Sequence, residues 1–100
     1  MKAPPEYIAP AELADRLQQE VATLDEADWA WWKQHSIAPF VASYRGLSHY
    51  VVAAAGRDVL YFADDEDEFG SGRLEGDVLT DCGLFGDLQD AIRGLRRLAA

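Results

Sequence analysis

Apolar residues recur at helical intervals in the first quarter of the chain. Leucine or valine stands at positions 13, 17, 21 and 24, at spacings of four, four and three residues. These spacings place the four side chains on one face of a helix. Pro10 suits the first turn of such a helix, where a missing N–H is no loss. The sequence therefore predicts an amphipathic helix that begins near Pro10.

A second helix is predicted from about Glu26 to His35. Asp25 can cap its beginning, and Asp28 stands three residues on, in the position of a capping-box acid. The helix must end before Pro39, because the residue that precedes a proline is disfavoured in helical conformation.

Three tryptophans stand within four residues of this second helix. Trp29 and Trp32 are three residues apart and share a helical face, so we expect both of them in the core. Trp31 points to another side and is expected to be half-exposed. An exposed tryptophan is a natural anchor for a binding partner, because tryptophan is enriched at the energetic centres of interfaces.

From residue 40 onward, helical periodicity gives way to short apolar and β-branched runs separated by turn residues. We expect strands at residues 40–44, 48–55, 59–62, 73–75 and 78–80. The run 59–62 is apolar throughout, which suggests a central strand covered on both faces. Residues 64–72, an acidic run that leads into Gly70-Ser71-Gly72, are expected to form a connecting loop.

Asp87 can cap a last helix, whose inward positions are Leu88, Ala91, Ile92, Leu95 and Leu98. Links of hairpin length imply antiparallel neighbours, since a parallel pair needs a crossover of about a dozen residues. The predicted fold class is therefore α+β, with two N-terminal helices, an antiparallel meander sheet of four or five strands, and a C-terminal helix packed on one face. One domain is expected over residues 1–100, with residues 1–9 as an extended lead-in.

The excess negative charge is concentrated in one third of the sequence. Residues 58–90 hold eight aspartates and three glutamates against one arginine, a net charge of −10, whereas the whole chain carries −9. At the centre of this region are five consecutive acids, residues 64–68, followed by Phe69. Such a concentration of charge steers cationic partners and repels nucleic acid and anionic membrane. We therefore expect a basic protein partner, and neither nucleic acid nor membrane.

Composition is typical of folded, cytoplasmic proteins. The chain is 49% hydrophobic and 11% aromatic, too apolar for a disordered segment. No run approaches the ~20 apolar residues that span a bilayer, and the first residues lack the apolar segment of a signal peptide. The single cysteine, Cys82, excludes an internal disulfide and a cysteine-based metal cluster.

The acidic run does not match a calcium-binding loop. An EF-hand loop that begins at Asp65 places Asp67 at position 3 and Gly70 at position 6, as required. It also places Phe69 at position 5 and Gly76 at position 12, where a bidentate glutamate is needed. No metal or cofactor site is predicted.

Residues capable of nucleophilic catalysis are few. The chain has two histidines, His35 and His49, and one thiol, Cys82. None lies in a Gly-x-Ser-x-Gly elbow, and the chain has no glycine-rich phosphate loop. We expect packing roles for all three residues and no enzymatic activity. A small enzyme that uses Cys82 or His49 stays open as a third alternative.

The predicted binding surface combines acids with aromatic anchors. Aromatic residues flank the acidic run directly, as expected of a surface that captures a basic cleft. A solvated loop that only keeps the protein in solution is the alternative interpretation. The candidate partner-binding residues are Asp64, Asp65, Glu66, Asp67, Glu68, Phe69 and Trp31.

Several segments of the second half of the chain follow the order found in a known group of proteins. They are Tyr50-Val51-Val52-Ala53, Val59-Leu60-Tyr61-Phe62-Ala63-Asp64-Asp65-Glu66, Phe69 and Asp87-Leu88-Gln89-Asp90-Ala91-Ile92-Arg93-Gly94-Leu95. With them, residues 38–98 resemble the SUKH-type superfamily of small bacterial immunity proteins, which protect a cell against its own interbacterial toxins. The resemblance implies a cytoplasmic protein that binds a cognate toxin domain and occludes its active site. The rival hypothesis is an acidic regulatory or adaptor module that binds a basic protein within its own cell.

Overall fold

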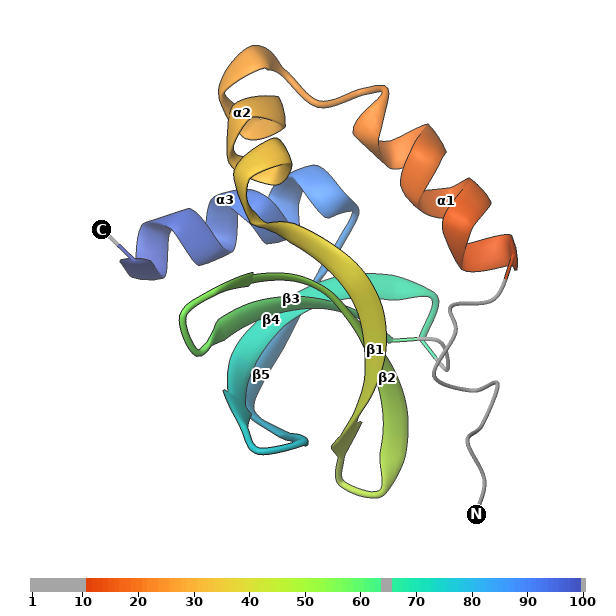
Figure 1. The fold of residues 1–100 in the computed structure, drawn as a ribbon, viewed down its shortest axis with the longest axis vertical. Coiled ribbons are helices and arrows are strands. Elements are labelled where there is room, and N and C mark those ends of the chain that lie inside the picture. Colours follow the sequence, from red (N-terminus) through yellow and green to blue (C-terminus); the bar gives the residue numbers. More distant parts are fainter. Residues whose placement is uncertain (1–10, 64–65, 100) are drawn as a thin grey trace.

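The computed structural model describes residues 11–63 and 66–99, and it confirms the α+β fold class (Figure 1). Two helices come first, five strands follow as an antiparallel meander, and a last helix packs against the sheet. The elements are α1 Ala11–Val21, α2 Glu26–His35, β1 Ser36–Tyr44, β2 Leu47–Ala55, β3 Asp58–Ala63, β4 Glu68–Glu75, β5 Val78–Gly86 and α3 Leu88–Ala99. The expected lead-in, residues 1–9, and two of the acids, Asp64 and Asp65, lie outside the described residues.

The five strands close into a barrel, which the sequence did not predict. Each strand pairs with the next in antiparallel fashion, and β1 also meets β5 in a parallel pairing of Ser43 with Val78. At the same seam, the Ser43 N–H donates to the Asp77 carbonyl, 2.9 Å away. The register shifts within the β1–β2, β2–β3 and β4–β5 pairs, and such bulges bend strands and increase their twist. This added twist helps to bring β1 round to β5.

Strand β4 begins earlier than predicted, because residues expected in a loop are paired with β3 and β5. Tyr61 of β3 lies opposite Gly70. A Cβ at Gly70 would stand 2.8 Å from the Tyr61 ring and would press against the carbonyl of Gly83 on β5. A Cβ at Gly72 would stand 3.0 Å from the Cys82 Sγ. These glycines are therefore strand residues that leave room for larger side chains on the neighbouring strands.

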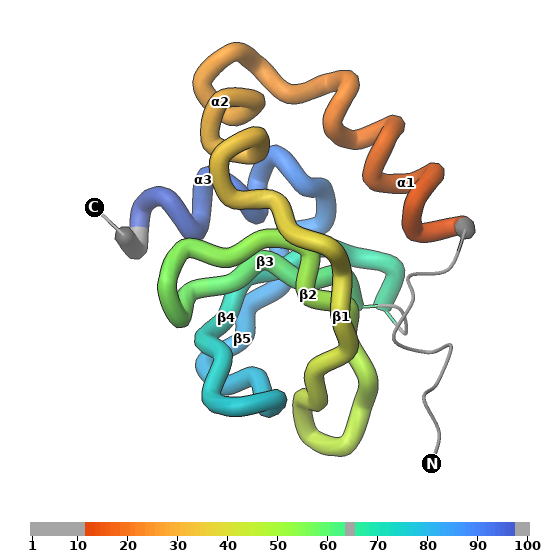
Figure 2. Tube along the Cα trace, viewed as in Figure 1, coloured from red at the N-terminus to blue at the C-terminus, as the bar shows by residue number. Residues whose placement is uncertain are grey.

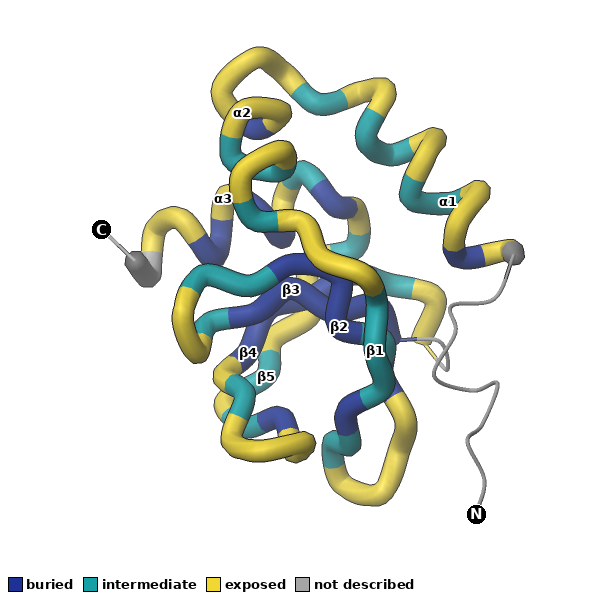
Figure 3. Tube along the Cα trace, viewed as in Figure 1, coloured by how far each residue is buried: buried dark blue, intermediate teal, exposed yellow. Residues whose placement is uncertain are grey.

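Two separate apolar clusters stabilise the molecule. The first lies between the sheet and the helices, which Figure 2 shows together on one side of the barrel, and its buried members are Leu13, Val52, Ala53, Leu60, Phe62, Phe69, Leu88, Ala91, Ile92 and Leu95. The second occupies the barrel interior, with Ala42, Val51, Val59, Tyr61, Ala63 and Leu79. Strand β3 supplies both clusters by alternation, and its residues 59–63 are at most 6% exposed (Figure 3). The prediction of a central strand covered on both faces is confirmed.

Helix α2 has the predicted bounds but turns a different face inward. Asp28 is fully buried, and its carboxylate forms ion pairs with two arginines of α3. Trp31 and Trp32, three and four residues on, lie on this face and pack half-buried against the core. Trp29 is 40% exposed, with the Lys33 ammonium over its ring. The prediction that Trp29 lies in the core is wrong, because the buried ion pair decides which side of the helix faces inward.

Candidate functional site

The described part of the acidic run includes the turn residues that lead into β4. Of its described members, Glu66 and Asp67 are exposed, and Glu68 begins β4 opposite Ala63. The Glu66 N–H donates to the Ala63 carbonyl at 3.1 Å. Asp67 adopts a φ of 56°, in the left-handed region that aspartate tolerates better than most residues. The turn is therefore tight, and it presents carboxylates to solvent.

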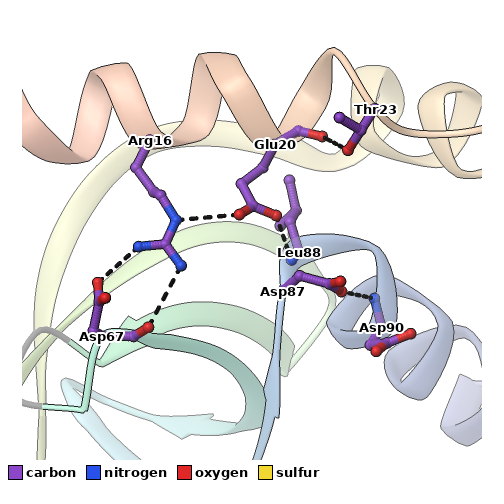
Figure 4. Close-up of polar contacts among 7 residues, drawn as sticks. All are labelled: Arg16, Glu20, Thr23, Asp67, Asp87, Leu88 and Asp90. Carbon is purple, nitrogen blue, oxygen red and sulfur yellow. Dashed lines mark hydrogen bonds and ion pairs between the residues drawn. The ribbon is translucent and has the colours of Figure 1, made fainter.

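Arg16 of α1 reaches across to hold this turn (Figure 4). Its guanidinium forms an ion pair with the Asp67 carboxylate, with 2.7 Å between Nη1 and Oδ1. The same guanidinium lies over the rings of Phe62 and Phe69, 5.5 and 5.6 Å from their centroids. Burial alone would lower the pKa of Arg16, but hydrogen bonds to Asp67 and Glu20 raise that pKa above its ordinary value. One acid of the turn is thus neutralised within the chain.

Glu20 extends this contact to the start of α3. Its Oε2 accepts from Arg16 Nε at 3.1 Å, and its Oε1 accepts from the Leu88 N–H at 3.0 Å (Figure 4). Asp87 is the cap of α3 that the sequence predicted, and it accepts from the Asp90 N–H at 2.8 Å. Charged side chains therefore link α1, the acidic turn and the beginning of α3, and they fix where the turn lies.

The two predicted aromatic anchors are not part of the acidic surface. Phe69 has no exposed surface and packs against Phe62, with ring centroids 5.0 Å apart. It is the second residue of β4 and lies in the core beneath the helices. The prediction that Phe69 is an anchor of the binding surface is therefore wrong. Trp31 is half-buried and lies beside His35, with 4.5 Å between ring centroids. The turn lies near the beginning of α1, whereas α2 follows the end of α1, so the structure does not bring Trp31 to the acids (Figure 1).

A pocket of about 320 Å³ opens directly beside the acidic turn. Four strands and the turn line it, through Tyr44, Leu47, His49, Tyr61, Ala63, Glu66, Cys82 and Leu84. Glu66 connects the pocket to the turn, while Leu47 and Leu84 are 49% and 44% exposed and give it an apolar rim. The sequence reasoning missed this pocket, although residues 47 and 49, 61 and 63, and 82 and 84 share strand faces by their spacing of two.

His49 is the buried polar residue of this pocket. It is 4% exposed, and its ring stacks on Tyr61 with centroids 5.1 Å apart and planes 13° from parallel. The Tyr44 ring lies 6.0 Å away. The Nδ1 atom of His49 is buried and has no hydrogen-bond partner, which is rare for a buried polar atom and costs stability. The expected packing role therefore leaves one ring nitrogen unexplained.

The surroundings of Cys82 disfavour its thiolate form. Burial raises the pKa of its thiol above the ordinary value, although a hydrogen bond with Tyr61 opposes part of that change. A reactive cysteine needs a lowered thiol pKa, because the thiolate is the attacking species. Within residues 11–63 and 66–99, no group of three or more histidine, cysteine, aspartate or glutamate side chains is placed to hold a metal ion.

Comparison with protein-family models, with curated proteins and with solved structures gave no match for this chain. No helix among its described residues is long and apolar enough to cross a membrane.

Proposed function

We propose that this chain is an immunity protein that binds a cognate interbacterial toxin domain in the cytoplasm and blocks its active site by occlusion. The observation that supports this best is the acidic turn joined, through Glu66, to a pocket with an apolar rim. Clustered carboxylates accelerate the encounter with a basic surface, and exposed apolar side chains then contribute affinity through desolvation. The surface thus has both parts that a tight protein inhibitor needs.

The ion pairs behind the turn favour binding as well. Arg16 and Glu20 hold the turn against α1 and α3 through Asp67, so the turn that carries Glu66 is already positioned before a partner arrives. A surface ordered in advance loses less conformational entropy on association, and more of the contact energy appears as affinity. The raised pKa of Cys82 agrees with inhibition by occupancy of the toxin and not by chemistry on it.

The test is a titration of the purified protein against any toxin domain that a gene beside its own encodes, with residual toxin activity as the readout. Inhibition is expected to saturate at one equivalent, through an interface near the standard ~1,600 Å². Cys82→Ser is expected to inhibit as well as the parent protein. Inhibition far below one equivalent that Cys82→Ser abolishes would reveal an enzyme and overturn the proposal. Tight binding that leaves the toxin fully active would point to the adaptor function instead.

A further inference from the structure

The pocket beside the acidic turn has the size and shape to receive a single side chain. Its volume of about 320 Å³ lies at the lower end of the ~300–1,000 Å³ typical of small-ligand sites. Apolar surface from Leu47 and Leu84 surrounds the entrance, and Tyr61 and His49 form a wall of stacked rings. A long side chain with a flat polar end matches this arrangement of an apolar entrance and an aromatic interior.

The charge of the pocket favours a cation. Glu66 is the one charged residue that lines it among the described residues, and the exposed Asp67 follows in the same turn. Asp67 is engaged on the helix side by Arg16, whereas Glu66 forms no ion pair with any described residue. The turn therefore directs one acid toward the helices and leaves another at the pocket.

The same chain shows how a guanidinium binds at such a surface. Arg16 lies over two phenylalanine rings while it pairs with Asp67. Arg45 lies over the ring of Tyr44, 5.3 Å from its centroid, at the edge of the pocket. Guanidinium groups stack on aromatic faces and pair with carboxylates at the same time, which a lysine ammonium does less well. The pocket offers both kinds of partner, in the rings of Tyr61 and His49 and in Glu66.

The unpartnered nitrogen of His49 adds a requirement for a hydrogen-bond donor. A neutral imidazole protonated at Nε2 presents Nδ1 as an acceptor, and a guanidinium carries five donors and no acceptor. The other tautomer would suit a carboxylate, but Glu66 repels a carboxylate. A half-turn of the ring about the Cβ–Cγ bond exchanges its two edges and returns the ring to the same plane, which preserves the stacking on Tyr61, so that a ring nitrogen can meet a donor in the pocket.

From these observations we infer that the pocket is a socket for one arginine side chain of the protein partner. The guanidinium stacks on the His49–Tyr61 wall, pairs with Glu66 and donates to a ring nitrogen of His49, and the aliphatic stem lies against Leu47 and Leu84. The assignment of the arginine to a toxin rests on the proposed function, whereas the chemistry of the socket does not.

The test uses the full chain and the peptide acetyl-Gly-Arg-Gly-amide, followed by NMR. Chemical-shift changes are expected at the methyl groups of Leu47 and Leu84 and at the His49 ring. The same peptide with citrulline, an uncharged analogue of arginine, should bind at least tenfold more weakly, and the lysine peptide severalfold more weakly. Equal binding of arginine and citrulline peptides, or shifts confined to other surfaces, would overturn the inference.

Three variants and one matched control sharpen this test. Glu66→Gln and His49→Phe should each weaken arginine-peptide binding at least fivefold, while Arg45→Gln should tighten it because a competing cation is removed. Glu26→Gln, at an exposed acid of α2, should leave it unchanged. If His49→Phe does not fold, the variants Glu66→Gln and Arg45→Gln still test the socket, because both of these residues are exposed. Weaker arginine-peptide binding in Arg45→Gln would mean that Arg45 does not compete with the bound guanidinium, and it would contradict the socket.

The two proposals fail separately. Specific binding of the arginine peptide without inhibition of any toxin would keep the socket and remove the immunity function. Stoichiometric inhibition of the toxin that Glu66→Gln and His49→Phe leave unchanged, with no peptide binding, would keep the function and remove the socket.

Discussion

Asp28 shows at the scale of single residues how one buried charge sets the orientation of a helix. The side chain of Asp28 is 1% exposed, whereas those of its partners Arg93 and Arg96 are 44% and 41% exposed. The contacts are 3.0 Å to Arg93 Nε and 2.7 Å to Arg96 Nη1. A buried carboxylate without a partner is much less favourable than a solvated arginine. Loss of the arginines and loss of the acid should therefore differ in their effect on stability.

Removal of the arginines is therefore expected to destabilise the fold more than removal of the acid. Asp28→Asn keeps the shape of the side chain and leaves both arginines in contact with water, so it should cost about 1–3 kcal/mol. The double variant Arg93→Ala/Arg96→Ala leaves Asp28 buried without a cation and should cost more. Urea unfolding followed by tryptophan fluorescence measures both, with the exposed Arg97→Ala as the control. Equal losses of unfolding free energy in Asp28→Asn and in the double arginine variant would contradict this account.

Asp25 gives the fold part of its acid sensitivity. The backbone N–H of Asp28, first, and then Arg93 hold the pKa of Asp25 below its ordinary value of 3.8. A carboxyl with a lowered folded-state pKa stabilises the fold above its unfolded pKa, and this stabilisation is lost as the pH falls through the lowered value. Asp25→Asn keeps an acceptor for the cap but does not titrate. Its melting temperature should therefore fall less steeply than that of the parent between about pH 5 and pH 2; parallel curves would argue against this role.

At the scale of elements, the sequence predicted what each segment encodes locally. Helix α2 has its predicted bounds, and β3 and the cap of α3 are confirmed, because periodicity and caps depend on neighbouring residues alone. The first half of β4 was missed, because Gly70 and Gly72 have no side chains that could show alternation. The reason for these glycines is the bulk of Tyr61 and Cys82 on adjacent strands, and no local pattern carries that information.

A pair of glycine substitutions tests this explanation of β4. Gly70→Ala places a methyl group 2.8 Å from the Tyr61 ring and should cost about 1–3 kcal/mol by overpacking. Gly83→Ala on the neighbouring strand has no atom within 4 Å of its new Cβ and should change stability little. Thermal unfolding of both variants is the measurement. Similar melting temperatures for the two would show that space around Gly70 does not limit the residue there.

At the scale of the whole molecule, the exposure of the acids could be predicted and the site around them could not. Clustered carboxylates stay in water because their desolvation is costly, and the described members of the run do lie on or near the surface. The pocket, in contrast, combines residues from four strands, which only barrel closure brings together. Phe69 was misplaced for the same reason, since its burial depends on helices distant in sequence.

The position of the acids, and not only their number, should control association with the partner. Replacement of Asp64, Asp65, Glu66 and Glu68 by their amides, with Asp67 kept for Arg16, should slow association at low salt and flatten its salt dependence. The matched control carries the same charge change on the helices, at Glu12, Asp15, Glu26 and Asp90. Stopped-flow or biosensor kinetics should show a much smaller effect for the control. Equal slowing in both variants would mean that net charge alone steers the partner.

The closure of the barrel has a mechanical consequence for the pocket. One parallel pairing, Ser43 with Val78, joins β1 to β5, whereas every other strand boundary is joined at five or more positions. The boundary between β1 and β5 is therefore the most weakly paired in the barrel. Tyr44, the residue after Ser43, lines the pocket. Because the core beneath the helices is a separate cluster, we expect the barrel to open at this boundary before that core unfolds. The boundary expected to open first therefore borders the pocket in which we propose that a partner's arginine binds.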